Sequence, residues 1–167
     1  MTDTIKVAVI GAGMMGKNHL KTYKGLNGVE LVGVYDIFPE ACKAAAETFG
    51  IKAFSSLEEV AENVDAVSVV TTSVTHAEVG EFFLNRGIHC LMEKPLATTE
   101  AECQRLISAA KNNNVTLLVG HIEQFNPAVE QMHKILSDTS KICSLTAQRM
   151  SCLLYTSPSP RDTERSR

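Results

Sequence analysis

The sequence lacks tryptophan, and only 5% of its 167 residues are aromatic. It also lacks an excess of basic charge, because 16 lysines and arginines against 19 aspartates and glutamates give a formal net charge of −3. No apolar run approaches the roughly 20 residues that a membrane helix needs. These features are typical of a soluble globular protein and argue against a nucleic-acid-binding or membrane-spanning protein.

The spacing of the cysteines matches no metal-binding or disulfide motif. The five cysteines form no C-x-x-C pair, and an odd number cannot all pair with one another. The first six residues have neither the cationic stretch nor the apolar core of a signal peptide. We therefore expect reduced thiols, no bound metal and a cytoplasmic location.

Short apolar runs rich in branched residues alternate with helical stretches over the first 120 residues. The run Ile5–Ile10 ends abruptly at a glycine, a helix is predicted to follow as far as about Leu26, and Glu30–Asp36 is the next strand. Further strands are predicted at Lys52–Phe54, Ala66–Thr71, Ile88–Met92 and Val115–Val119, and further helices at Pro39–Phe49, from Ser56, at Thr75–Asn85 and at Thr99–Asn113. This alternation predicts an α/β fold, a doubly wound parallel sheet that forms a Rossmann dinucleotide-binding domain over residues 1–120.

The pattern changes after residue 120. A helix at Pro127–Leu136 and a strand at Ile142–Arg149 lead us to interpret residues 121–150 as a connecting helix and the first strand of a truncated α+β substrate domain. Residues 151–167 shift to serine, proline and arginine, and Cys152–Asp162 resembles the translation of a transposase-based sequencing adapter. We expect these last residues not to be native protein, with the natural sequence beyond about Met150 missing. A disordered polar tail is the alternative.

The loop Gly11-Ala12-Gly13-Met14-Met15-Gly16 has G-x-G-x-x-G spacing, follows a strand and opens a helix. The first glycine permits a tight turn, the second lets the backbone approach a pyrophosphate, and the third lets the helix pack closely on the sheet. Amides at the helix N-terminus would bind the phosphates. Asp36, at the end of the second strand, is placed to accept hydrogen bonds from the adenosine ribose and to repel the extra phosphate of NADP. Together these residues predict NAD as the cofactor.

A third motif follows the strand at Ile88–Met92. Glu93-Lys94-Pro95 lies at the carboxyl end of that strand, where ligands bind in open sheets of this kind. In this place the motif resembles the Gfo/Idh/MocA family of sugar and inositol dehydrogenases, and the resemblance covers Ile5–Met150. It implies that Glu93, Lys94 and Pro95 line the cofactor, and that Lys94 is the catalytic residue that positions the substrate and shares a proton.

Two further segments carry the resemblance. Thr71-Thr72-Ser73-Val74-Thr75-His76 is similar to the family's segment beside the nicotinamide, with Thr72 in place of the usual proline. The resemblance implies that Thr71, Thr72, Ser73 and His76 contact the cofactor. Gly120–Val129, together with Met15–His19, resembles the branch that oxidises UDP-N-acetylglucosamine, although Gln124 stands where that branch usually has arginine. It implies substrate-side roles for His121 and Asn126.

The resemblance implies an NAD-dependent dehydrogenase that transfers a hydride from a sugar-nucleotide hydroxyl to NAD. The family's lysine works beside an Asp and a His of the second domain, often spaced D-x-x-x-H, and this sequence contains no such pair. We therefore expect the chain to be the NAD-binding half of an enzyme, inactive by itself, and the whole protein to be a homo-oligomer. A free-sugar or inositol dehydrogenase of the same family, and a non-catalytic NAD-sensing regulator, are the alternatives.

Overall fold

The computed structural model describes residues 4–136 together with Ser144 and Thr146. The chain divides into two units, Met1–Ile122 and Glu123–Arg167, and each is described by itself. The predicted strand at Ile142–Arg149 lies outside the described residues apart from Ser144 and Thr146. The adapter-like residues 151–167 lie outside them entirely.

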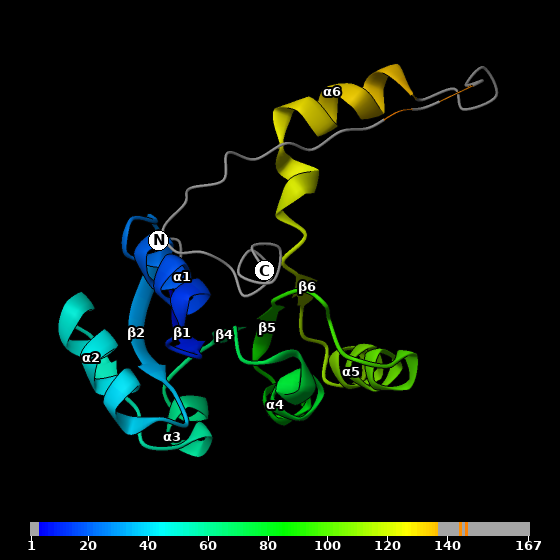
Figure 1. The fold of residues 1–167 in the computed structure, drawn as a ribbon. Helices are drawn as coiled ribbons and strands as arrows, with labels where there is room; N and C mark the ends of the chain where they lie inside the picture. The colour runs from blue at the N-terminus through cyan, green and yellow to red at the C-terminus, as the bar shows by residue number, and fades with distance from the viewer. Residues whose placement is uncertain (1–3, 137–143, 145, 147–167) are drawn as a thin grey trace, which may run out of the picture. The chain divides into compact units, whose positions relative to one another are not determined.

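The first unit is built on a sheet of six parallel strands in the order β3-β2-β1-β4-β5-β6 (Figure 1). The strands are β1 (Ile5–Ile10), β2 (Val29–Tyr35), β3 (Lys52–Ala53), β4 (Ala66–Val69), β5 (His89–Met92) and β6 (Leu117–Val119). The order reverses between β1 and β4, so the topological switch point of the sheet lies there. The predicted doubly wound parallel sheet is confirmed.

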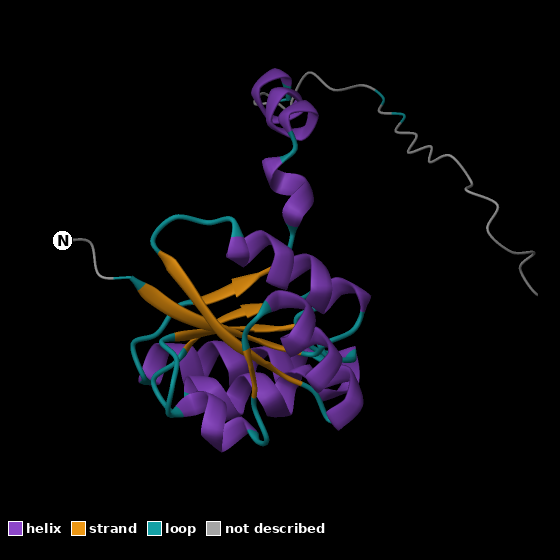
Figure 2. Ribbon diagram, turned by 90° about the vertical axis from the view of Figure 1, so that its left-hand side faces the viewer, coloured by secondary structure: helices purple, strands orange, loops and turns teal. Residues whose placement is uncertain are grey.

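Helices cover both faces of this sheet (Figure 2). They are α1 (Met14–Lys24), α2 (Pro39–Phe49), α3 (Leu57–Ala61), α4 (His76–Leu84) and α5 (Glu100–Asn112), and a 3-10 turn η1 (Ser73–Thr75) precedes α4. The helices α1 and α2 share one apolar cluster with the sheet, whereas α3, α4 and α5 share the other.

The central strand β1 carries an unbroken apolar and buried run, Val7–Ile10, after the exposed Ile5 and Lys6. Val9 packs into the cluster beneath α1 with Leu20, while Ala8 and Ile10 pack into the opposite cluster with Phe83. Successive side chains of a strand point to opposite faces, so a strand covered on both faces needs apolar residues at every position. This burial fixes β1 at the centre of the sheet, directly before the glycine loop.

The second unit contributes a single described helix, α6 (Pro127–Ile135), and a 3-10 turn η2 (Ile122–Phe125) spans the boundary between the units. Asn126 begins α6, because its side-chain Oδ1 accepts a hydrogen bond from the backbone N–H of Ala128 at 3.0 Å. Pro127 occupies the first turn, where its missing N–H costs no helix hydrogen bond. None of the helices within residues 4–136 has the length and apolar composition needed to cross a bilayer.

Candidate cofactor and active site

The predicted site residues of the first unit follow the carboxyl ends of neighbouring strands. Backbone hydrogen bonds continue the ladder past these ends: the N–H of Gly11 donates to Tyr35 at 2.8 Å, and the N–H of Glu93 donates to Val69 at 2.9 Å. The glycine loop, Asp36, the segment after β4 and the Glu93-Lys94-Pro95 loop therefore share one edge of the sheet. Ligands bind at this edge, next to the switch point, in doubly wound folds.

The glycine loop is shaped by two positions where a side chain has no room. Gly11 has φ +110°, and a Cβ there would lie 2.6 Å from the carbonyl oxygen of Val70. A Cβ on Gly16 would clash with the carbonyl oxygen of Gly11. Gly11 therefore lets the loop approach the backbone that follows β4, and Gly16 lets α1 pack closely on the start of the loop.

Gly13 differs from its two neighbours in the motif. A Cβ on Gly13 would meet nothing within 4 Å, so this glycine faces open space. As the N-cap residue of α1, it has no side chain that could occupy the amides of the first turn. Those amides, at the positive end of the helix dipole, remain available to a phosphate group. The shape and the donors of this loop fit the pyrophosphate of a dinucleotide.

Asp36 is held beside the glycine loop by two backbone amides. Its Oδ2 accepts from the N–H of Ala12 at 2.6 Å, and its Oδ1 accepts from the N–H of Phe38 at 2.9 Å. A carboxylate oxygen can accept more than one hydrogen bond, so both oxygens keep capacity for ribose hydroxyl donors. The geometry thus fits the predicted contact with the adenosine ribose.

The segment after β4 is tied to the Glu93-Lys94-Pro95 loop through His76. This side chain is only 1% exposed, and its Nδ1 lies 2.8 Å from the carbonyl oxygen of Pro95 while its Nε2 lies 3.1 Å from that of Thr71. Carbonyl oxygens only accept, so a neutral ring donates to one of them and a protonated ring donates to both. His76 therefore joins two loops of the site, and its contact with the cofactor stays a prediction.

Thr71, Thr72 and Ser73 lead from β4 into η1. The Thr75 hydroxyl lies 2.8 Å from the Thr71 hydroxyl and 2.9 Å from the carbonyl oxygen of Thr72. Thr72 takes an extended conformation as the N-cap of η1, with φ −70° and ψ 145°. This φ is close to the value that proline imposes, so Thr72 takes a backbone conformation that the family's proline could also adopt.

In the Glu93-Lys94-Pro95 loop, the glutamate is buried and the lysine is exposed. Oε2 of Glu93 accepts a hydrogen bond from the backbone N–H of Lys94 at 3.1 Å, and the Lys94–Pro95 peptide bond is cis. The carboxylate thus fixes the backbone from which the lysine side chain extends.

His19 on α1 belongs to this site, although the sequence indicated no role for it beyond its place in the segment Met15–His19. Its Nε2 lies 3.1 Å from Oε1 of Glu93, and the two side chains are 15% and 11% exposed. The available signal was its position on the face of α1 that carries buried Gly16 and Leu20, where a polar side chain needs a polar partner. The partner itself is 74 residues away in the sequence.

The two predicted substrate-side residues fall in different units. His121 is exposed and its backbone N–H donates to the carbonyl of Val119 at 2.7 Å. Asn126 caps α6, and its Nδ2 donates to Glu123 Oε2 at 3.0 Å. Contacts of either residue with a substrate stay predictions.

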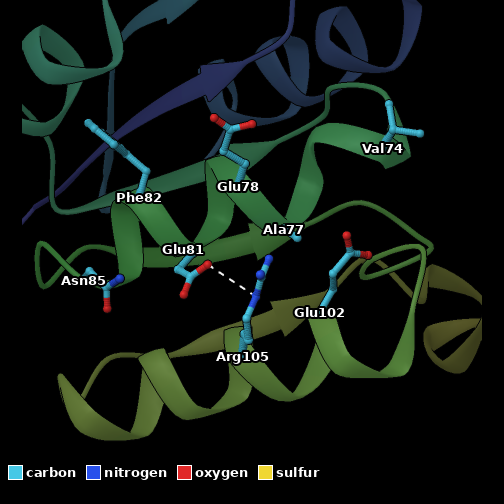
Figure 3. A pocket seen from close by; sticks show the side chains of 8 residues that line it. All are labelled: Val74, Ala77, Glu78, Glu81, Phe82, Asn85, Glu102 and Arg105. Carbon is cyan, nitrogen blue, oxygen red and sulfur yellow. Dashed lines mark ion pairs between the residues drawn. The ribbon is translucent and has the colours of Figure 1, made fainter.

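A hollow of about 600 Å³ lies between α4 and α5 (Figure 3). It is lined by Val74, Ala77, Glu78, Glu81, Phe82, Asn85, Glu102 and Arg105, none of which is a predicted cofactor residue. Three carboxylates against one guanidinium, itself 3.6 Å from Glu81, would repel a pyrophosphate. Within residues 4–136, no group of three or more His, Cys, Asp or Glu side chains is arranged to hold a metal ion.

Comparison with known proteins supports the geometry. The family model described as "Oxidoreductase family, NAD-binding Rossmann fold", that of Gfo/Idh/MocA, matches residues 5–121. UDP-N-acetylglucosamine 3-dehydrogenase of Acidithiobacillus ferrooxidans is 34% identical over 130 residues, which are 78% of this chain and 41% of that enzyme. Its solved structure superposes with a TM-score of 0.75.

The chain is also similar to proteins whose names refer to other substrates or pathways. Inositol 2-dehydrogenase of Salmonella typhimurium is 30% identical over 80% of this chain and 41% of its own length. The structure of GenD2 from gentamicin A biosynthesis, in complex with NAD, superposes with a TM-score of 0.78 at 27% identity, over 83% of this chain and 40% of GenD2. The chain thus spans about two fifths of the length of these relatives. It belongs to the Gfo/Idh/MocA family of oxidoreductases and carries the family's NAD-binding Rossmann domain.

Proposed function

We propose that this chain is the NAD-binding half of a dehydrogenase that oxidises a hydroxyl of a sugar nucleotide of the UDP-N-acetylglucosamine type. The observation that carries the proposal is the exposed Lys94 at the same strand-end edge as the glycine loop and Asp36. A cofactor whose pyrophosphate lies on α1 and whose ribose lies on Asp36 would extend along this edge toward the loop of Lys94.

Different residues serve cofactor binding and proton transfer. The first-turn amides of α1 hold the phosphates, and Asp36 holds the ribose hydroxyls. When bound, NAD supplies the hydride acceptor. Lys94 positions the substrate hydroxyl and shares the proton that leaves it as the hydride is transferred. We assign the nicotinamide side of the site to Thr71, Thr72, Ser73, His76, Glu93 and Pro95, and we assign substrate-side roles to His121 and Asn126.

The proposed substrate class is supported by the 34% identity to UDP-N-acetylglucosamine 3-dehydrogenase and by the segment Gly120–Val129. A second candidate, an inositol or free-sugar dehydrogenase, is supported by the 30% identity to inositol 2-dehydrogenase. In either case we propose that the whole protein is a homo-oligomer whose second domain supplies the Asp and His that work beside Lys94.

The cofactor part of the proposal is tested by titrating the chain with NAD and NADP in a calorimeter. We expect NAD to bind about tenfold more tightly or better, because Asp36 repels a 2′-phosphate. Equal or tighter binding of NADP would contradict the assignment.

The substrate part is tested with the product of the intact gene, assayed for NADH formation with UDP-N-acetylglucosamine, myo-inositol and free N-acetylglucosamine. The proposal predicts turnover of the sugar nucleotide alone, and loss of this turnover in Lys94→Met. Turnover of myo-inositol or the free sugar in its place would favour the second candidate.

A further inference from the structure

The side chains of His19 and Glu93 connect the helix that starts at the glycine loop with the backbone of Lys94. Glu93 uses both carboxylate oxygens: Oε1 lies 3.1 Å from His19 Nε2, and Oε2 accepts from the N–H of Lys94 at 3.1 Å. A carboxylate oxygen only accepts, so His19 donates through Nε2–H. The result is a continuous path from α1 through one carboxylate to the loop that carries the lysine.

The Glu93 end of this path is confined. Its side chain is 11% exposed, and a Cβ on Gly120 would lie only 3.2 Å from its Oε1, so the carboxylate packs against the backbone there. A carboxylate buried to this degree is costly without partners, and His19 is the side-chain partner that offsets this cost. Removing the His19 donor therefore frees Glu93 to move or to take up water.

The His19 end is confined as well. Its ring makes an edge contact with Tyr23, with centroids 6.5 Å apart, and the Tyr23 hydroxyl lies 2.6 Å from Ser68 Oγ on β4. His19 and Tyr23 are four residues apart, so they share one face of α1. The imidazole is thereby held against α1, at a position that the contact of Tyr23 with β4 also fixes.

The start of α1 is the proposed phosphate site, only one to two helical turns from His19. A ligand that fixes the first turn of α1 thereby also fixes the donor to Glu93. From these contacts we infer that His19 is a positioning residue: it couples occupancy of the glycine loop to the placement of Lys94, through Glu93. The inference rests on the proposed roles of the glycine loop and Lys94.

Coupling between two sites is reciprocal and measurable as a change in one site when the other is filled. The probe is the backbone amide of Lys94, observed by NMR in the ¹⁵N-labelled chain with and without saturating NAD. In the wild type we expect NAD to shift this resonance and to slow its hydrogen exchange by about fivefold or more.

His19→Phe keeps an aromatic ring against Tyr23 but removes the N–H. We expect this variant to bind NAD while the exchange rate at Lys94 changes less than about twofold on binding. His19→Gln restores an N–H donor at a similar reach and should restore the response. Lys21→Ala, on the exposed side of the same helix, is the matched control and should behave as the wild type.

Glu93→Gln provides an independent variant, because an amide cannot accept at both positions. Its effect and that of His19→Phe should not add in the double variant if both interrupt one path. A wild-type response in His19→Phe, or equal loss in His19→Phe and His19→Gln, would overturn the coupling while leaving NAD binding intact. Failure of the wild type to bind NAD would overturn the proposed function as well.

Discussion

Two glycines of one loop should respond differently to the same substitution, one by a loss of stability and the other by a loss of NAD affinity. A Cβ on Gly16 would clash with the backbone of Gly11, so Gly16→Ala should destabilise the fold by about 1–3 kcal/mol. For Gly13→Ala the poorer N-cap and the stiffer unfolded chain offset each other, and the stability should change by less than about 1 kcal/mol. NAD affinity should nevertheless fall about tenfold, because the new methyl group points where the pyrophosphate approaches.

Urea denaturation and NAD titration of both variants separate these effects. The prediction requires that Gly13→Ala lowers the affinity for NAD while it leaves the free energy of unfolding almost unchanged. It is wrong if Gly13→Ala binds NAD as the wild type does.

Asp36 is the residue that sets the preference between the two dinucleotides. Asp36→Asn keeps a side-chain carbonyl near the amides of Ala12 and Phe38 but removes the charge. Hydrogen bonds to charged groups contribute about 1.5–3 kcal/mol, so NAD affinity should fall by roughly tenfold or more. Discrimination against NADP should shrink at the same time. Glu40→Gln, which removes an exposed charge from the first turn of α2, is the control.

Single residues of the site can be predicted from the sequence when they belong to one short motif. Gly11, Gly13, Gly16 and Asp36 belong to a compact motif, and the structure places Asp36 on the amide of Ala12. His19 was missed because its partner Glu93 lies in a distant strand-end loop, and no short motif records such a contact.

Among the secondary-structure elements, α3 is joined to β3 by an ion pair in which Lys52 Nζ lies 2.6 Å from Glu59 Oε1. Hydrogen bonds, the largest from Lys52 and smaller ones from Ser55, lower the pKa of the Glu59 carboxyl from 4.5 to about 2. A pKa lowered by folding means stability that is fully present above the unfolded pKa and is lost as the pH falls through the folded one. Glu59→Gln should therefore be less stable than the wild type at neutral pH.

Between pH 4.5 and about 2 the difference between Glu59→Gln and the wild type should narrow, because the wild-type carboxylate becomes protonated. Thermal unfolding followed by circular dichroism across this range measures it. Glu58→Gln, on the same first turn but exposed, is the matched control. A stability difference between Glu59→Gln and the wild type that stays constant with pH would show that the shape of the Glu59 side chain, and not its charge, stabilises the fold.

Helix starts could be predicted from sequence because their caps are local. Thr99 and Ser56 each accept from the amide three residues on, and α2 has the bounds that its pattern predicts. Strand ends were predicted unevenly: the predicted ends at Ile10, Met92 and Val119 are confirmed, and those of the other strands are off by one or two residues. The predicted strand Ala66–Thr71 ends at Val69, because the next residues belong to the loop that packs against Gly11 and leads into η1. Apolar periodicity alone did not show that this strand leaves the sheet after Val69.

For the molecule as a whole, the alternation of strands and helices predicted the doubly wound sheet but not its strand order. The order β3-β2-β1-β4-β5-β6 places the glycine loop beside the segment after β4, although 60 residues of sequence separate Gly11 from Thr71. The site is therefore a product of topology. Each motif is short, and the sheet brings the motifs together at one edge.

The chain as a whole should bind NAD without turning over a substrate. Hydride transfer needs the substrate carbon held against the nicotinamide and a group that accepts the hydroxyl proton. Within residues 4–136, Lys94 is the proposed catalytic group, and the D-x-x-x-H pair of the family is missing from the sequence. We therefore expect the chain to bind NAD and to form no NADH with UDP-N-acetylglucosamine, myo-inositol or free sugars.

The UDP-N-acetylglucosamine 3-dehydrogenase of Acidithiobacillus ferrooxidans, run in the same absorbance assay, controls for reagents and substrate quality. NADH formation by the chain that exceeds the Lys94→Met background would show that the described residues suffice for catalysis, and the second-domain Asp and His would then be unnecessary. NAD binding without turnover would leave substrate placement as the missing requirement, because cofactor and lysine alone cannot hold a sugar carbon at reacting distance.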